Sequence, residues 1–146
     1  MSAGPDTARA GAAMSQSPEQ VNRRDVVAEV TDALMRYEAA LTGNDVEMLD
    51  TLFWDSEHTV RYGATEMLYG HDEIQAFRRA RNPANLDRRI RRIAITTFGE
   101  DFATASIEFE RAHENGVTIG RQSQCWVRFD VGWRVVSAHV SVLPKN

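Results

Sequence analysis

Tyr37 and Arg61 are the two residues whose types and surroundings point most directly to chemistry. Tyr37 lies on an apolar stripe of helical spacing, three residues after Leu34 and four before Leu41, so its ring is expected to face the interior. A buried phenol needs a hydrogen-bond partner and can act as a proton donor. Arg61 lies in the extended segment 59–63, and its guanidinium matches the two oxygens of a carboxylate.

The residues alone leave other roles open for both side chains. Tyr37 is also consistent with a purely structural place in the core. Arg61 is a surface charge on an edge strand, a structural ion pair with Glu66 or another acid, or the receptor of an anionic substrate. Glu66 is the convenient carboxylate nearby and is a further candidate for the substrate site.

The stretch "GRQSQCWVRF" adds candidate hydrogen-bond donors on a predicted strand. Alternation places Gln122, Gln124, Trp126 and Arg128 on one face, and Cys125 with its neighbours on the other. The first face either lines a polar substrate site or forms an ordinary outer surface of the sheet.

The stretch "GWRVVSAHVS" predicts the last strand. Strict alternation puts His139 and Ser141 on the face of Trp133 and Val135, opposite Ala138. His139 and Ser141 are therefore candidate substrate-binding donors, although a single histidine on a strand is more often structural.

Several familiar chemistries have no basis in this sequence. The histidines show no metal-ligand spacing, and no HExxH, CxxC, P-loop, GxGxxG or GxSxG motif occurs, so neither a metal nor a cofactor is expected. Cys125 lies inside a predicted strand, and without an adjacent base it is a poor candidate nucleophile.

Composition predicts one soluble domain. The chain has 146 residues, 42% of them hydrophobic, a net charge of −4 and a single cysteine. One cysteine and no long apolar run favour a cytoplasmic protein without a membrane partner. The run 78–92 holds seven arginines and one aspartate. We interpret it as a solvated helix end and strand start, because it lacks interleaved aromatics, and a nucleic-acid partner is not expected.

The order of elements predicts an α+β fold. Residues 1–16 are expected to be a disordered leader and 17–146 a single domain, with a long helix beginning at Ser17. Expected helices and strands follow at 44–53, 58–63, 66–69, 71–81, 89–98, 101–112, 117–129 and 133–142. We therefore predict a cone-shaped, curved antiparallel sheet with about three N-terminal helices packed on its concave face.

Four motifs in this order carry a family resemblance. "RYEAALTGNDVEMLDTLFW", "TVRYGATEMLYG", "FGEDFATASIEFE" and "GRQSQCWVRF" are similar to the AtzH-like family, also called the oxalurate-catabolism HpxZ-type family. The resemblance covers about residues 20–143. It lies within the nuclear transport factor 2-like superfamily, which includes ketosteroid isomerases and SnoaL-like proteins.

The resemblance implies a function and two catalytic residues. Its implied activity is a decarboxylating amidohydrolase acting on a small carboxylated urea such as 1,3-dicarboxyurea, in nitrogen catabolism of cyanuric acid or oxalurate. Tyr37 and Arg61 match the tyrosine and arginine that the family is implied to use. One alternative is a non-catalytic binding or accessory subunit of an amidase; another is a ketosteroid-isomerase-like proton transfer with Glu66 as the base. A homodimer is expected, joined through the open face of the sheet.

Overall fold

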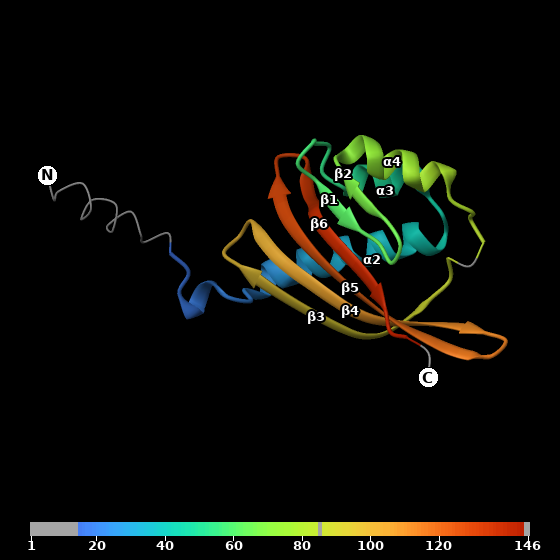
Figure 1. Cartoon of the computed structure of the whole chain (residues 1–146). Helices are drawn as coiled ribbons and strands as arrows, with labels where there is room; N and C mark the ends of the chain where they lie inside the picture. The colour runs from blue at the N-terminus through green and yellow to red at the C-terminus, as the bar shows by residue number, and fades with distance from the viewer. Residues whose placement is uncertain (1–14, 85, 145–146) are drawn as a thin grey trace, which may run out of the picture.

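The computed structural model describes residues 15–84 and 86–144, which form helices packed on one face of a curved sheet (Figure 1). The helical elements are η2 (Pro18–Gln20), α2 (Arg24–Thr42), α3 (Val46–Leu52) and α4 (His71–Ala80). The strands are β1 (Val60–Tyr62), β2 (Met67–Tyr69), β3 (Arg89–Phe98), β4 (Phe102–His113), β5 (Gly116–Phe129) and β6 (Gly132–Val142). The predicted α+β class is confirmed. None of the helices in the described ranges has the length and apolar character needed to cross a bilayer.

The six strands form one sheet in the order β2-β1-β6-β5-β4-β3. β3 to β6 make the predicted antiparallel meander. β1 and β2 pair as an antiparallel hairpin, but β1 runs parallel to β6, with Arg61 opposite Ala138. The sheet is therefore mixed rather than wholly antiparallel. No tight turn joins β1 to β6, so the turn geometry that forces antiparallel neighbours does not act on this pair.

The N-terminal helix starts later than the sequence pattern predicts. Ser17 precedes only a short 3₁₀ turn, without a side-chain cap, and α2 begins at Arg24. Between them Asn22 has a φ of 59°, and its side-chain oxygen accepts a hydrogen bond from the Thr97 amide at 2.9 Å. This contact with β3 replaces the predicted first helical turns. The expected disordered leader lies outside the described residues, apart from its last two positions.

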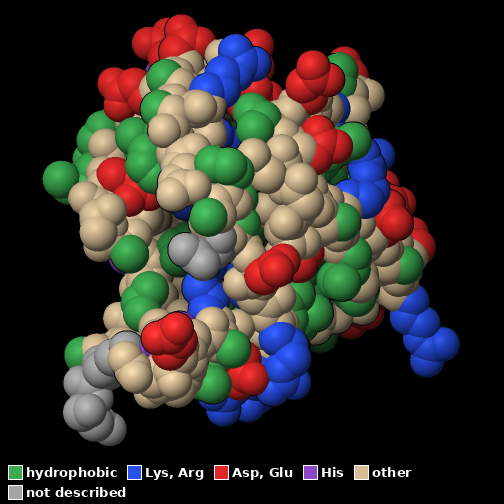
Figure 2. Space-filling model, turned by 90° about the vertical axis from the view of Figure 1, so that its right-hand side faces the viewer, with side chains coloured by type: hydrophobic (Ala, Val, Ile, Leu, Met, Phe, Trp, Pro, Cys, Tyr) green, Lys and Arg blue, Asp and Glu red, His purple; other side chains and the backbone are tan. Residues whose placement is uncertain are grey.

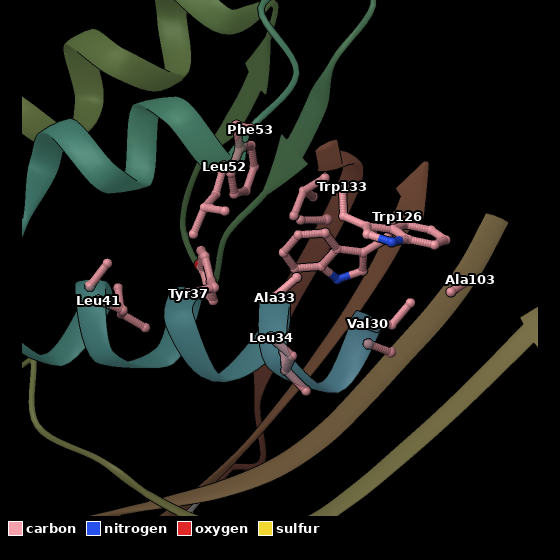
Figure 3. Close-up of a cluster of buried hydrophobic side chains, with 14 of the residues drawn as sticks. Val30, Ala33, Leu34, Tyr37, Leu41, Leu52, Phe53, Ala103, Trp126 and Trp133 are labelled. Atoms are coloured by element: carbon pink, nitrogen blue, oxygen red, sulfur yellow. The ribbon is translucent and has the colours of Figure 1, made fainter. Parts of the chain in front are cut away.

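α2 supplies one wall of the core. The predicted stripe is confirmed, because Val30, Leu34, Tyr37 and Leu41 are all buried. They face the sheet and α3, where Trp126 is fully buried (Figure 3). Burial of this stripe is the main stabilisation of the helix against the sheet. It also fixes the direction in which the Tyr37 ring points.

A β-bulge in β6 reverses the faces of the last strand. Trp126 pairs with Val135 and Cys125 pairs with Ser137, so Val136 is an extra residue in β6. Because side chains alternate strictly along a strand, one extra residue moves every later side chain to the opposite face. Ala138 therefore points inward, whereas strict alternation from Trp133 places it on the opposite face.

Gly120 on β5 makes room for an aromatic ring on β4. It is the register partner of Phe109, and a Cβ at this position would lie 2.1 Å from the Phe109 ring. We expect Gly120→Ala to lower the free energy of unfolding by about 1–3 kcal/mol, because Phe109 is buried and cannot move aside freely. Urea unfolding measures the loss. Ser123→Ala on the exposed face of β5 is the control, and equal stabilities of the two variants would contradict the prediction.

Candidate functional site

Four arginine side chains lie near one another, and two of them, Arg78 and Arg81, lie within electrostatic range of Tyr37. We call Arg61, Arg78, Arg81 and Arg88 the arginine cluster. They come from β1, from α4, from the residue that ends α4 and from the segment before β3. Arg61 and Tyr37 both lie close enough to Arg78 and Arg81 to change their pKa values. The cluster therefore acts as one electrostatic unit.

Tyr37 lies at the helical side of this unit. It is 2% exposed, and its ring centroid is 6.0 Å from that of Phe53. Figure 3 shows the side chain projecting from α2 towards the end of α3. The Arg78 guanidinium lies over the same ring, 4.1 Å from the Phe53 centroid. Phe53 thus contacts both the phenol and a guanidinium.

Arg61 is held by an acid from its own hairpin. Its Nη1 donates to Glu66 Oε2 at 2.7 Å, and its guanidinium lies 5.5 Å from the Phe77 ring centroid. Burial raises the pKa of Glu66, but hydrogen bonds from Arg61 and Thr65 outweigh it and leave the pKa below the usual range. The structural ion pair, which the sequence left open, therefore exists in the ligand-free protein. Glu66 is ionised at neutral pH.

Gly63 is what allows this ion pair to form. A Cβ on Gly63 would lie 1.8 Å from the Glu66 carboxylate, so Gly63→Ala must displace it from Arg61. We expect a loss of about 1–3 kcal/mol in unfolding free energy, because Arg61 then stays buried without its partner. Urea unfolding in a double-mutant cycle tests the cause: in a Glu66→Ala background the same change should cost almost nothing. Equal costs in both backgrounds would contradict this account.

Arg88 has a second, separate acid. Its Nε and Nη2 donate to the two Glu38 oxygens at 2.8 and 2.7 Å, and Nη2 also reaches Gln122 Oε1 at 3.0 Å. The Arg88 side chain is 2% exposed and lies 4.3 Å above the Phe109 ring centroid. This bidentate pair ties α2 to the start of β3 and to the sheet.

The sheet contributes amide donors from β5. Gln122 and Gln124 are each 2% exposed and share the inner face with Trp126, as one of the two predicted alternatives requires. Their oxygens accept hydrogen bonds from Arg88 and from the Trp126 indole. Their Nε2 atoms are buried and lack a partner among the described residues. Both of these unpartnered Nε2 groups are hydrogen-bond donors, which suits a ligand with hydrogen-bond acceptors.

His139 and Ser141 do not join the cluster. The bulge at Val136 moves them to the outer face, where Ser141 accepts a hydrogen bond from Arg121 at 3.2 Å. His139 is exposed and packs edge-on against Tyr62 at 5.7 Å. The prediction that they share the inner face of Trp133 and Val135 is therefore wrong, and a part in substrate binding stays an untested prediction. Strict alternation, which ignores the extra residue, was the reason for that prediction.

Arg128 and Cys125 also lie away from the arginine cluster. Arg128 is exposed and pairs with Asp101 at 2.9 Å. Cys125 is half-buried on the outer side, and burial raises the pKa of its thiol, which disfavours the thiolate needed for nucleophilic attack. Among the described residues, no three His, Cys, Asp or Glu side chains are arranged to hold a metal ion.

Comparison with known proteins identifies the family. The AtzH-like family profile matches residues 19–146. The chain belongs to the AtzH-like family. No match was found among functionally curated proteins.

Solved structures related to this AtzH-like chain agree with the fold. A protein of unknown function from Pectobacterium atrosepticum is 56% identical, with a TM-score of 0.85 over 89% of this chain and 100% of its own. A cystatin-like fold protein from Burkholderia xenovorans is 42% identical, with a TM-score of 0.79 over 86% and 98%. A nuclear transport factor 2-like superfamily protein from Salmonella enterica is 22% identical, with a TM-score of 0.67 over 84% and 94%, and supports the fold alone.

Sequence reasoning missed three members of the arginine cluster in this AtzH-like chain. Arg78, Arg81 and Arg88 lie in the run that was interpreted as solvated, yet Arg78 is 2% exposed. Helical spacing gave a usable signal, because Arg78 and Arg81 follow the inward-facing Ile74 at four and seven residues. The surface at this end of the molecule mixes acidic and basic side chains (Figure 2). It shows no single-sign basic patch of the kind that nucleic acids favour.

Proposed function

We propose that this AtzH-like protein is a decarboxylating amidohydrolase acting on a small carboxylated urea of the 1,3-dicarboxyurea type, in nitrogen catabolism of cyanuric acid or oxalurate. One observation carries the proposal: the buried Tyr37 lies within electrostatic range of two guanidinium groups, those of the buried Arg78 and the half-buried Arg81. Family membership supports the reaction class. The substrate class is anionic, which matches the charge of the cluster.

The chemistry assigns a role to each group. Water adds to the carbonyl carbon of the bond to be cleaved, and negative charge develops on the carbonyl oxygen. Arg61 opposes that charge, while the Tyr37 hydroxyl donates a hydrogen bond or a proton to the leaving nitrogen. The C–N bond breaks, the proton released by the added water restores the Tyr37 hydroxyl, and the nitrogen leaves as a neutral amine or amide. Any carbamate that forms loses carbon dioxide without further help from the protein.

The two alternatives are less well supported. A ketosteroid-isomerase-like proton transfer needs a carboxylate base, and Glu66 is a weak one because the ion pair with Arg61 lowers its pKa. An accessory subunit that binds no ligand would have no use for unpaired buried donors, which cost stability, whereas a non-catalytic binding subunit would. Assembly as a homodimer stays a prediction. The outer face that it would use is more polar than the sequence indicated, since Ser123, Ser137 and His139 are exposed there.

The test is to add purified protein to ¹³C-labelled 1,3-dicarboxyurea and follow the substrate and carbonate by NMR. Because carbamates also decarboxylate unaided, the rate is taken relative to a protein-free sample. A protein-dependent loss of substrate with release of carbonate is expected. A rate equal to that of the protein-free sample would reject this substrate, and the accessory-subunit alternative would then stand.

A further inference from the structure

Arg78 and Arg81 carry donors that nothing in the described structure uses. Arg78 Nη1 reaches the Leu49 carbonyl oxygen at 3.3 Å, whereas its Nη2 has no partner among the described residues. Arg81 leaves both Nε and Nη2 without one. All three nitrogens are buried, so bulk water does not compensate for the missing hydrogen bonds.

These two arginines are also the unpaired charges of the cluster. Glu66 neutralises Arg61 and Glu38 neutralises Arg88, but no ion pair to Arg78 or Arg81 occurs within residues 15–84 and 86–144. Burial, together with neighbouring positive charges, lowers the pKa of Arg78 to about 10, and it lowers that of Arg81 as well. Both guanidiniums therefore remain charged at neutral pH. An unpaired buried charge is costly unless a counter-charge arrives.

The geometry of α4 places the two groups together. Arg81 directly follows the last residue of α4, three residues after Arg78, and its charge is close enough to lower the pKa of Arg78. The positive charge of Arg61 lowers the pKa values of both groups, and that of Arg88 also lowers the pKa of Arg81. Guanidinium groups bind planar carboxylates through paired hydrogen bonds, with a directionality that an ammonium group lacks.

We propose that Arg78 and Arg81 form a carboxylate-binding subsite. It is separate from Arg61, whose guanidinium is already paired with Glu66. Two unneutralised charges favour a dianion, with one carboxylate on this pair and the rest of the molecule directed towards Tyr37. Within the proposed function, on which this role in turnover rests, the subsite holds the carboxylate remote from the bond that breaks. The pair then determines specificity rather than chemistry.

The test uses malonate, a dicarboxylate with no C–N bond to hydrolyse, so it does not depend on turnover. Isothermal titration at constant ionic strength compares the wild-type protein with Arg81→Gln. Arg79→Gln is the matched control, because Arg79 lies two residues earlier in α4, but its side chain is 59% exposed and pairs with Asp50. We expect Arg81→Gln to weaken malonate binding by about tenfold or more and Arg79→Gln to leave it unchanged. Equal weakening by both variants, or no malonate binding by the wild type, overturns the subsite.

A second measurement separates this role from a structural one. If Arg81 is an unpaired charge awaiting a ligand, ligand-free Arg81→Gln should melt at the wild-type temperature or above it. A lower melting temperature with unchanged malonate affinity would overturn the subsite. Should Arg81→Gln fail to fold, Arg78→Lys replaces it in the titration, because lysine keeps the charge and the apolar stem over Phe53 and removes the planar fork.

The two proposals fail in different ways. Malonate binding that depends on Arg81, without release of carbonate from dicarboxyurea, would reject the proposed reaction and keep the subsite. Carbonate release with a wild-type KM in Arg81→Gln would reject the subsite and keep the reaction.

Discussion

Replacing Tyr37 by phenylalanine is expected to lower the rate of carbonate release by about a hundredfold or more. Phenylalanine keeps the ring that packs against Phe53 and removes only the hydroxyl. The loss therefore isolates the donor role from the packing role. Carbonate release measured by ¹³C NMR, above the protein-free rate, gives the turnover, and thermal unfolding reports whether the fold is retained.

Tyr62→Phe is the matched control for this experiment. The Tyr62 hydroxyl hydrogen-bonds to Tyr69 at 2.9 Å in an exposed position, outside the arginine cluster. Its removal should leave the rate within the error of the assay. A Tyr37→Phe variant as active as Tyr62→Phe would show that Tyr37 is a core residue only.

Glu38→Ala is expected to lower the free energy of unfolding by about 3–5 kcal/mol. Glu38 is 8% exposed and its carboxylate binds Arg88 through both oxygens, so its loss leaves a buried guanidinium without a counter-charge. The effect is large because the penalty comes from the stranded arginine rather than from the lost attraction. Urea unfolding measures the change.

Two further variants identify the source of that loss. Asp32→Ala on the same helix removes a carboxylate that is 75% exposed and only 4.0 Å from Arg36, so it should cost almost nothing. The double variant Glu38→Leu, Arg88→Met replaces the pair by apolar side chains and should recover most of the stability. If the double variant is no more stable than Glu38→Ala, the stranded charge is not the cause.

The hydrophobic pattern was sufficient to predict most helices and strands. Ranges 89–98 and 133–142 agree with β3 and β6 to within one residue, because strongly periodic segments bounded by glycine turns leave few alternatives. The predicted start of α2 at Ser17 was wrong. The contact between Asn22 and Thr97 replaces the first helical turns, and it depends on a strand far away in sequence. Local capping rules do not include such tertiary contacts.

The site was predictable only in part. Burial of Tyr37 followed from the helical stripe, and the sequence allowed the pairing of Arg61 with Glu66 as an alternative. Glu38 lies off that stripe, so the burial of Glu38 is explained only by its ion pair with Arg88 in the folded protein. Which members of an arginine-rich run turn inward depends on the path of the chain between α4 and β3, and composition carries no information on that path.

The parallel pairing of β1 with β6 has a consequence for synthesis of the protein. Arg61 emerges from the ribosome early, but its strand hydrogen-bonds to β6, which emerges after β3, β4 and β5. Such long-range pairing forms late, because a large loop must close before it is stabilised. The hairpin that carries Arg61 and Glu66 therefore waits for the C-terminal strand, and a nascent chain lacking β6 has its helices and most of its sheet before the ion pair between Arg61 and Glu66 is held in place.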